Sequence, residues 1–260
     1  MGKQTLGGTL FVYNGISNDY CVAEAVASLK ALCDEVVLLD AGSTDGTDKL
    51  LMSFADDTTK VILLPHEEWE KQKGREKLSY FTNIAISYLT TDWNINLQAD
   101  EVIHEKSFDA IRSAIEEPNC ESFWNWRINL WGNSQHLLNV DDSRKPVGDF
   151  IIRLAKAKYK SIDDAQSIDA QPANHRYITD IRIYHMGFVR SKYVHTEKIR
   201  HMLVDVFLMG GNDPKVEAMG NEFNPWIHFS KEDVVSIQEP LPIFIQEWAK
   251  ERDKINGFEI

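Results

Sequence analysis

The chain has 260 residues, of which 43% are hydrophobic and 26% are charged, a composition typical of globular proteins. Its formal net charge of −12 opposes sequence-independent attraction to nucleic acid or to anionic lipid. The three cysteines lack the spacing of a zinc site or a disulfide framework, and no apolar run reaches the ~18 residues of a membrane span. These features predict a cytoplasmic protein with reduced thiols.

The first hundred residues alternate between strand and helix patterns. Apolar runs predict strands at 9–13, 35–40, 60–64 and 93–98. Apolar residues at helical spacing predict helices after Ser17-Asn18-Asp19, after the AGSTDGT turn at 41–47, and over 75–90. Continuous apolar strands separated by helices are typical of a parallel sheet covered on both faces, so the fold class is α/β.

The second half of the chain has a different pattern. The run SFWNWRINLW alternates along 122–131, which predicts a half-exposed strand. We expect the side with Trp124, Trp126, Ile128 and Leu130 to face the core, with stacking of the tryptophans on sugars as the alternative. Further strands are expected at 149–156 and 176–187, and helices at about 191–209 and after Pro242. These predict a main domain over 1–210 and a C-terminal extension over 211–260 packed on it.

Carboxylates follow two of the predicted strands. Asp40 ends one strand, and Gln98-Ala99-Asp100-Glu101 follows another. Ligands of parallel α/β sheets bind at the carboxyl ends of strands, so Asp40 and Asp100 are expected to share one crevice. A charge in a dry site is costly unless it is compensated, so the acids after 93–98 either face water or meet a cation.

Four segments in this order resemble glycosyltransferase family 2, the inverting nucleotide-sugar transferases of GT-A fold. They are DEVVLLDAGSTDGTDKLL (34–51), WNINLQADEVIHE (93–105), FIIRLAKAKY (150–159) and YHMGFVRSKYVHTEK (184–198). The last two segments fit bacterial and phage members, and the resemblance covers roughly residues 8–200. It implies a GT-A type, Rossmann-like mixed sheet flanked by helices, and sugar transfer from a nucleotide diphosphate donor.

The resemblance also implies a donor site. Asp40, Ser43 and Asp45 would contact the nucleotide, because carboxylates accept hydrogen bonds from an imide N–H or a ribose hydroxyl. Gln98 takes the first position of the family's DxD motif and would bind the ribose without a charge. Within the family uridine is the commonest base, so a UDP-sugar is expected. The alternative for Asp40 and Asp45 is that they only cap the turn and the next helix.

The last acid of the DxD motif is Asp100, which the resemblance assigns to a divalent cation together with His185. Mn²⁺ or Mg²⁺ held there would neutralise the departing diphosphate. Arg190 and Lys192 would bind diphosphate oxygens. The alternatives are solvated acids, a structural histidine and ordinary surface charges.

Transfer requires a general base that takes the proton of the acceptor hydroxyl. The resemblance places this base after the arginine-bearing strand, so Asp164 is the first candidate and Asp163 the second, with turn capping as the alternative. Glu101 is a further candidate that we expect to orient the site instead. The acceptor is a glycan, a lipid-linked sugar, a protein or a modified base of phage DNA. The negative net charge of the chain opposes binding to DNA. A DNA acceptor would therefore require a local basic groove, for which the candidates are Arg144, Lys145, Lys156, Lys158 and Lys160.

Two other functions would predict different sequence features. A nucleotidylyltransferase would carry a glycine-rich basic loop after the first strand, whereas VYNGISNDY (12–20) has one glycine and no basic residue. A non-catalytic nucleotide-sugar-binding protein would explain the amide at Gln98. The retention of Asp100 and His185 favours an enzyme.

Overall fold

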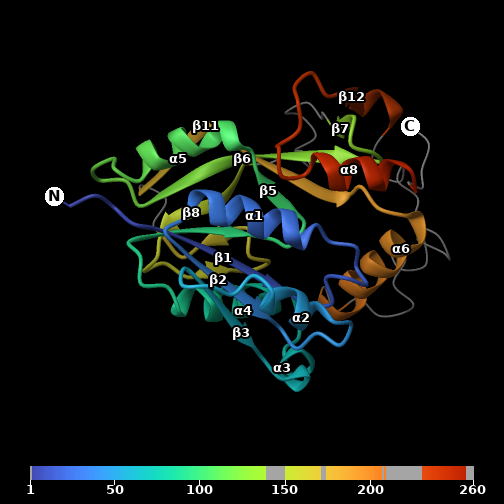
Figure 1. The fold of residues 1–260 in the computed structure, drawn as a ribbon, viewed down its shortest axis with the longest axis horizontal. Helices are drawn as coiled ribbons and strands as arrows, with labels where there is room; N and C mark the ends of the chain where they lie inside the picture. The colour runs from blue at the N-terminus through green and yellow to red at the C-terminus, as the bar shows by residue number, and fades with distance from the viewer. Residues whose placement is uncertain (1, 139–149, 171–173, 207, 209–229, 256–260) are drawn as a thin grey trace.

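The computed structural model describes residues 2–138, 150–170, 174–206, 208 and 230–255. In these ranges ten strands form one sheet in the order β12-β7-β6-β8-β4-β1-β2-β3, with β11 paired to β6 and β5 (Figure 1). The strands of the sheet are β1 (Leu6–Val12), β2 (Glu35–Asp40), β3 (Thr59–Leu63), β4 (Trp93–Leu97), β5 (Glu101–Ile103), β6 (Ser122–Trp131), β7 (His136–Leu138), β8 (Phe150–Lys156), β11 (His175–Phe188) and β12 (Val234–Ser236). A separate hairpin consists of β9 (Ser161–Ile162) and β10 (Ser167–Ile168). The α-helices are α1 (Val22–Leu32), α2 (Thr47–Met52), α3 (His66–Lys71), α4 (Glu76–Ser87), α5 (Phe108–Ala114), α6 (Lys192–His201) and α8 (Gln246–Asp253).

The parallel half of the sheet brings three strand ends to one edge. β1 pairs in parallel with β2, where Val12 lies beside Asp40 in the register. β1 also pairs in parallel with β4, where Leu10 lies beside Leu97. Parallel strands point the same way, so the residues after β1, β2 and β4 all emerge at this edge. Asp40 and Asp100 therefore flank the end of β1, one on either side.

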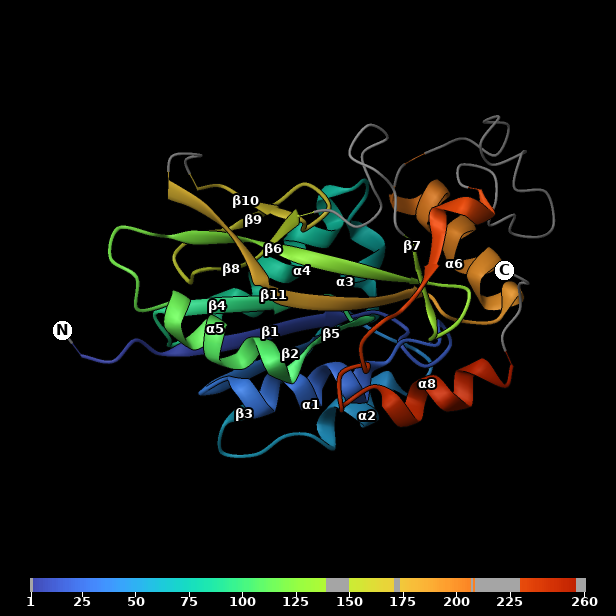
Figure 2. The ribbon, with the colours of Figure 1, turned by 90° about the horizontal axis from the view of Figure 1, so that it is seen from above.

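Helices cover both faces of this half. α1 and α5 lie on one face and α4 lies on the other, as two perpendicular views show (Figures 1 and 2). Leu10 of β1 is fully buried in one core cluster with Leu29 of α1. Its neighbour Phe11 points to the opposite face and lies 5.9 Å from the ring of Phe81 in α4. Apolar residues thus occupy both faces of β1, and the predicted α/β class is confirmed.

The antiparallel half returns distant segments to the same edge. β8 runs antiparallel to both β4 and β6. β11 runs parallel to β6, with His185 beside Asn129, and antiparallel to β5, with His185 beside Glu101. This mixed pairing places His185 next to the end of β4. The two segments are far apart in the sequence, so their proximity cannot be seen from the order of residues along the chain. The predicted mixed sheet is confirmed.

The prediction for the faces of β6 is wrong in the first part of the strand. Trp126 is 41% exposed, whereas Arg127 on the opposite face is 8% exposed and Asn129 is fully buried. The polar face turns inward because it meets an internal carboxylate and a cavity, which supply partners for its charge and amide groups. Only toward the end of the strand does the apolar face enter a core cluster, through Leu130.

Most predicted elements have the expected type, but their boundaries differ in places. The cap of α1 is Cys21, not Ser17-Asn18-Asp19; Asp19 adopts a left-handed φ of 54°. The helix expected over 191–209 is α6 followed by a π-helical turn, η4 (Met202–Val206). α3, β5 and α5 were not predicted, because six, three and seven residues are too few to show a clear period.

The described C-terminal residues pack on the same sheet. β12 pairs antiparallel with β7, and Ile245 joins Leu130 and Tyr184 in a core cluster. The boundary expected near residue 210 lies outside the described residues. In the part of the chain that the structure describes, no helix has the length and apolarity needed to cross a membrane.

Candidate functional site

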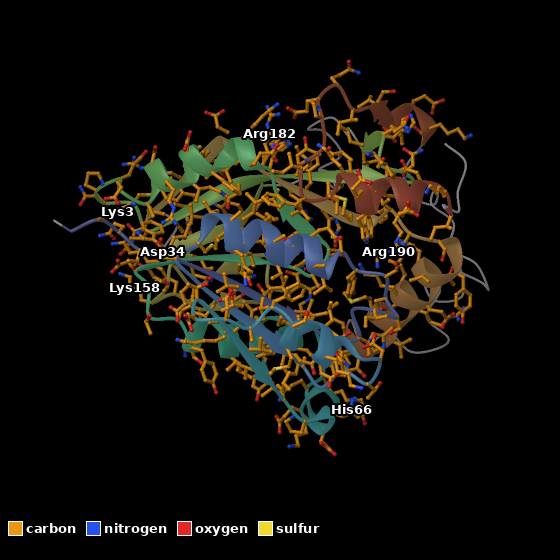
Figure 3. The ribbon with its side chains drawn as sticks, viewed as in Figure 1. Lys3, Asp34, His66, Lys158, Arg182 and Arg190 are labelled. Carbon is orange, nitrogen blue, oxygen red and sulfur yellow. The ribbon has the colours of Figure 1, made fainter. Side chains whose placement is uncertain are left out.

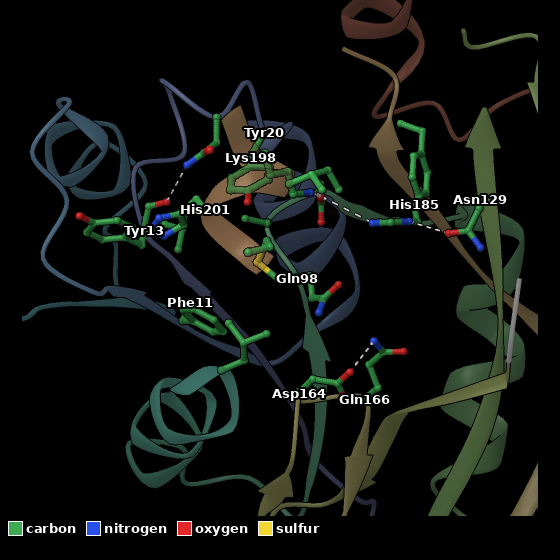
Figure 4. Close-up of a pocket in the computed structure, with 18 of the residues that line it drawn as sticks. Phe11, Tyr13, Tyr20, Gln98, Asn129, Asp164, Gln166, His185, Lys198 and His201 are labelled. Carbon is green, nitrogen blue, oxygen red and sulfur yellow. Dashed lines mark hydrogen bonds and ion pairs between the residues drawn. The ribbon is translucent and has the colours of Figure 1, made fainter. Parts of the chain in front are cut away.

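A cavity of about 320 Å³ lies at the edge of the sheet where β1 and β4 end (Figure 4). This volume is within the range of small-molecule sites. Its lining combines aromatic and aliphatic side chains with a few convergent polar groups. The lining includes Tyr13, Tyr20, Trp69, Gln98, Asp100, Asn129, Asp164, Gln166, His185, Lys198 and His201.

Asp100 is buried, and three nitrogen atoms converge on its Oδ2 atom. Lys198 Nζ lies 2.8 Å away, Arg190 Nη2 lies 3.2 Å away, and His185 Nε2 lies 3.6 Å away. Burial by itself raises the pKa of Asp100, but the positive charges of Lys198 and Arg190 more than offset this and hold the pKa well below its usual value. Asp100 is therefore a carboxylate whose charge is compensated within the chain.

Tyr20 holds the two cations of this cluster side by side. The Arg190 guanidinium lies 5.0 Å and Lys198 Nζ lies 4.9 Å from the centre of its ring. Arg190 is fully buried beside α6 and also donates to the carbonyl oxygen of Asn18 at 2.8 Å (Figure 3). Burial and the charge of Arg190 lower the pKa of Lys198 to about 8, although Asp100 acts in the opposite direction.

His185 is oriented by Asn129. Its Nδ1 lies 2.6 Å from Asn129 Oδ1 and donates to it, which leaves the lone pair of Nε2 facing Asp100. Burial lowers the pKa of His185, so the ring is neutral at neutral pH. A Cβ at Gly187 would lie 2.3 Å from the imidazole Cε1 atom. Only glycine leaves room for the ring there, which explains why a glycine stands two residues after His185.

Glu101 belongs to a buried ion pair and does not line the cavity. Arg153 Nε and Nη2 each donate to one of its carboxylate oxygens at 2.8 Å, and both side chains are fully buried. Arg127 Nη1 lies 3.9 Å from Glu101 Oε1, and the backbone N–H of Gln98 donates to Oε2 at 3.0 Å. Glu101 therefore fixes the turn after β4, and its geometry is that of an orienting group.

The turn after β2 is closed by Asp40. Its Oδ2 accepts from the backbone N–H groups of Gly42 and Ser43 at 3.2 and 2.9 Å. Its Oδ1 is buried and has no hydrogen-bond partner among the described residues. Burial raises the pKa of Asp40, against the effect of these hydrogen bonds. Ser43 Oγ accepts from the backbone N–H of Asn14 at 2.8 Å, which ties the turn to the end of β1.

Asp45 stabilises the start of α2. Its Oδ1 accepts from the backbone N–H of Thr47 at 3.1 Å and from the Thr47 hydroxyl at 2.6 Å. Its Oδ2 accepts from the backbone N–H of Ser17 at 2.8 Å. These are the contacts of the capping alternative. The cavity lining contains none of the three turn residues predicted to bind the nucleotide, although it contains Val12, which lies beside Asp40.

The turn of the β9–β10 hairpin presents one of the two candidate bases to the cavity. Asp164 lines the cavity, and Gln166 Nε2 donates to its Oδ2 at 3.2 Å (Figure 4). Asp163 is exposed, does not line the cavity, and has a left-handed φ of 52°, which aspartate tolerates. A ligand in the cavity can therefore reach Asp164 and not Asp163.

The remaining wall near β1 is aromatic. Tyr13 stacks on Trp69 with ring centres 4.0 Å apart and an interplanar angle of 8°. His201 lies 6.2 Å from Trp69 at 17°. Gln98 extends from the end of β4 toward the cavity, between this wall and Asp164 in the view of Figure 4. Stacked, nearly parallel rings beside an uncharged amide suit a planar, polar ligand.

Asp100 and His185 fit a divalent cation whose remaining coordination positions a bound ligand and water would fill. The Nε2 lone pair of His185 faces an oxygen of the Asp100 carboxylate, and a cation between these two electron-rich atoms would stabilise the pair. Asn129 accepts from Nδ1 and so orients the ring, as hydrogen-bond partners of metal-bound histidines do. Among the described residues, no group of three or more His, Cys, Asp or Glu side chains could hold a metal ion. Mg²⁺ often takes one or two protein ligands and the rest from phosphate and water, so two suffice.

Some site residues were not found from the sequence. Lys198 lies in the quoted segment 184–198, seven residues after Ser191, the N-cap of α6, so it lies two turns into that helix. Asn129 belongs to the polar face of β6, which the alternating pattern predicts to face solvent but which is buried at this residue. The sequence signal for Asn129 is the polar run Asn125, Arg127 and Asn129 opposite the two tryptophans. Such a polar face can border a binding cavity as well as solvent.

Of the basic groove expected for DNA, the three residues that the structure describes, Lys156, Lys158 and Lys160, do not line the cavity. Lys158 pairs with Glu121 at 2.5 Å and lies at the end of the molecule opposite Arg190 (Figure 3). Arg144 and Lys145 lie outside the described residues, as does the side chain of Lys192.

Comparison with known proteins supports the resemblance. The profile described as "Glycosyl transferase family 2" matches residues 12–143, just over half of the chain. An uncharacterized glycosyltransferase of Rickettsia conorii is 28% identical over 109 residues, which are 42% of this chain and 34% of that protein. The lipopolysaccharide core biosynthesis glycosyltransferase LpsC of Rhizobium meliloti is 25% identical over 115 residues, 44% of this chain and 38% of that protein. The chain thus spans about a third of the length of these curated relatives.

Solved structures show a more distant likeness. Glucosyl-3-phosphoglycerate synthase from Mycobacterium tuberculosis, in complex with phosphoglyceric acid, has a TM-score of 0.48 at 12% identity, covering 77% of this chain and 79% of its own. That similarity is too low to carry an argument about chemistry. The family profile, in contrast, spans the turn after β2 and the Gln98-Ala99-Asp100 strand end that line or flank the cavity. From this match we conclude that the chain belongs to glycosyl transferase family 2.

Proposed function

We propose that this chain transfers a sugar from a UDP-sugar to an acceptor hydroxyl, with inversion at the anomeric carbon and with the help of Mn²⁺ or Mg²⁺. The observation that carries the proposal is one cavity with two chemically different ends. One end has Asp100, His185, Lys198 and the buried Arg190 behind them, which suit a diphosphate. The other end has Asp164, a carboxylate suited to take a proton.

The uridine assignment rests on Asp40 and on the family. The unpartnered Asp40 Oδ1 is an acceptor that lies beside the end of β1, and an imide N–H of uracil is a donor that would satisfy it. A buried acceptor without a donor is costly, so a ligand that supplies one gains affinity. The rings of Tyr13 and Trp69 provide a flat wall nearby for a base.

In the reaction, the role of the cation end is to stabilise charge. Asp100 and His185 would hold the divalent cation, which when bound acts as a Lewis acid on the diphosphate. Lys198 and Arg190 add positive charge beside it, so the negative charge that develops on the leaving group is stabilised. Asp164 accepts the proton as the acceptor oxygen attacks the anomeric carbon from the opposite side. A single displacement of this kind inverts the configuration and needs no covalent intermediate.

Donor and cation binding can be tested by thermal unfolding. A ligand that binds the folded state alone raises the unfolding temperature, on the order of 5 °C or more at a hundred times its dissociation constant. We expect UDP with Mn²⁺ to give such a shift, and GDP or CMP to give a smaller one.

Asp100→Asn serves as the variant for the cation assignment. It removes one charge at nearly constant size, so the additional shift that Mn²⁺ causes with UDP should disappear. A larger shift with GDP would overturn the choice of base. An undiminished effect of Mn²⁺ on the variant would overturn the assignment of Asp100.

A further inference from the structure

The position expected for the cation is already contacted by a positive charge of the chain. Lys198 Nζ lies 2.8 Å from Asp100 Oδ2, the same oxygen that faces His185 Nε2 at 3.6 Å. A divalent cation bound between Asp100 and His185 would therefore meet the ammonium group of Lys198. Two like charges that close repel each other strongly in a buried site, so both cannot keep these positions.

The two cations beside Asp100 differ in their freedom to move. The Arg190 side chain is fully buried, and besides Asp100 it donates to the carbonyl oxygen of Asn18. The Lys198 side chain is 15% exposed and lines the cavity. Its Nζ donates a hydrogen bond to Asp100. A flexible four-carbon stem lets such an ammonium group move by several ångströms at small cost.

The local charge also favours an anion without any metal. Four cationic side chains surround the two buried carboxylates, Asp100 and Glu101. They are Arg127, Arg153, Arg190 and Lys198. With a neutral His185, the cluster carries an excess of two positive charges, which matches a diphosphate better than it matches a second cation.

Resting on the proposed function, we propose that Lys198 is an exchangeable internal counter-ion. In the unliganded protein it takes the place of the divalent cation on Asp100. When the nucleoside diphosphate binds, it moves from Asp100 to a phosphate oxygen and leaves the carboxylate to the metal. Lys198 therefore opposes the binding of metal alone, and it promotes the binding of diphosphate with or without metal.

The test measures Mn²⁺ alone and UDP alone, by titration calorimetry at pH 7, on the wild-type chain and on Lys198→Met. Removal of the competing charge should make Mn²⁺ bind about tenfold more tightly in the absence of nucleotide. Removal of a phosphate ligand should make UDP in EDTA bind about tenfold more weakly. These opposite changes distinguish an exchanging counter-ion from a merely structural lysine, whose loss would weaken both.

Two control variants and a folding measurement accompany this test. Lys198→Arg retains the charge and should resemble the wild type in its weak binding of Mn²⁺. Lys30→Met removes a lysine that pairs with Asp56 on the surface, away from the cavity, and should change neither affinity. Unfolding curves of all variants show whether each is folded; if Lys198→Met is not folded, Lys198→Gln takes its place.

Unchanged or weaker binding of Mn²⁺ by the charge-removing variant would overturn the proposal. The Mn²⁺ measurement contains no nucleotide, so it decides the role of Lys198 even if the donor is not a nucleotide. If the wild type binds no UDP in either the presence or absence of metal, the proposed function fails separately.

Discussion

Replacement of Asp164 by asparagine is expected to lower the rate of sugar transfer by about 10²-fold or more, the usual scale for loss of a general base. Asparagine keeps the size of the side chain and its contact with Gln166, but it cannot accept a proton. Donor affinity should hardly change, because the carboxylate does not contact the Asp100 cluster. The measurements are kcat with a UDP-sugar and acceptor, and the dissociation constant of UDP.

Asp163→Asn is the matched control for this experiment. Asp163 lies one residue away, is exposed, and has a left-handed backbone that asparagine also adopts readily. It should therefore keep nearly the wild-type rate. Equal losses in the two variants would reject Asp164 as the base and favour a role of the hairpin turn as a whole.

The stereochemistry of the product tests the same mechanism independently. With an α-linked sugar donor, a single displacement assisted by Asp164 gives a β-linked product. Proton NMR of the anomeric signal distinguishes the two products directly. An α-linked product would contradict the mechanism, whatever the effect of the variants.

Arg153→Met is expected to lower the free energy of unfolding by about 3–5 kcal/mol, the range for breaking one partner out of a buried ion pair. Glu101 would remain fully buried with Arg127 at 3.9 Å as its cationic partner. That loss is a large part of the about 5–15 kcal/mol that stabilises a typical domain. Urea denaturation measures it from the midpoint and the slope.

Two controls separate the ion pair from the loss of packing. Lys156→Met replaces a cation on the same strand outside the pair and should change stability by no more than about 0.5 kcal/mol. Glu101→Gln combined with Arg153→Met removes both charges and should recover much of the loss. No recovery in the double variant would show that packing, not the buried charge, dominates.

The direction of the pKa shift of Glu101 decides how the stability from this ion pair depends on pH. Burial raises the pKa of Glu101, but the charges of Arg153 and Arg127 more than offset it, so the folded pKa lies below the ordinary value. The pair therefore contributes its full stability above the pKa of the unfolded chain, about 4.3 for glutamate. That contribution is lost as the pH falls through the folded pKa, and Arg153→Met should lack this part of the acid dependence.

Local patterns were enough to predict much of the fold. The strand predicted over 35–40 has the same bounds as β2, and the strand predicted over 122–131 has those of β6. Both have a clear apolar or alternating pattern with the short period of a strand, which depends only on neighbours along the chain. The pattern of β6 did not show which face is buried, because that depends on what lies opposite it. Arg127 and Asn129 face Glu101 and the cavity, and those partners come from other strands.

The sequence by itself determined the α/β class, the family, and the placement of Asp40 and Asp100 at the ends of two strands, since these follow from local patterns and motifs. Only the tertiary structure decided which charged groups meet. Asp100 and Lys198 are 98 residues apart in the chain, and Arg153 and Glu101 are 52 apart. A carboxylate is compensated by whichever cation the packing of strands and helices brings within about 3–4 Å, and no local pattern contains that distance.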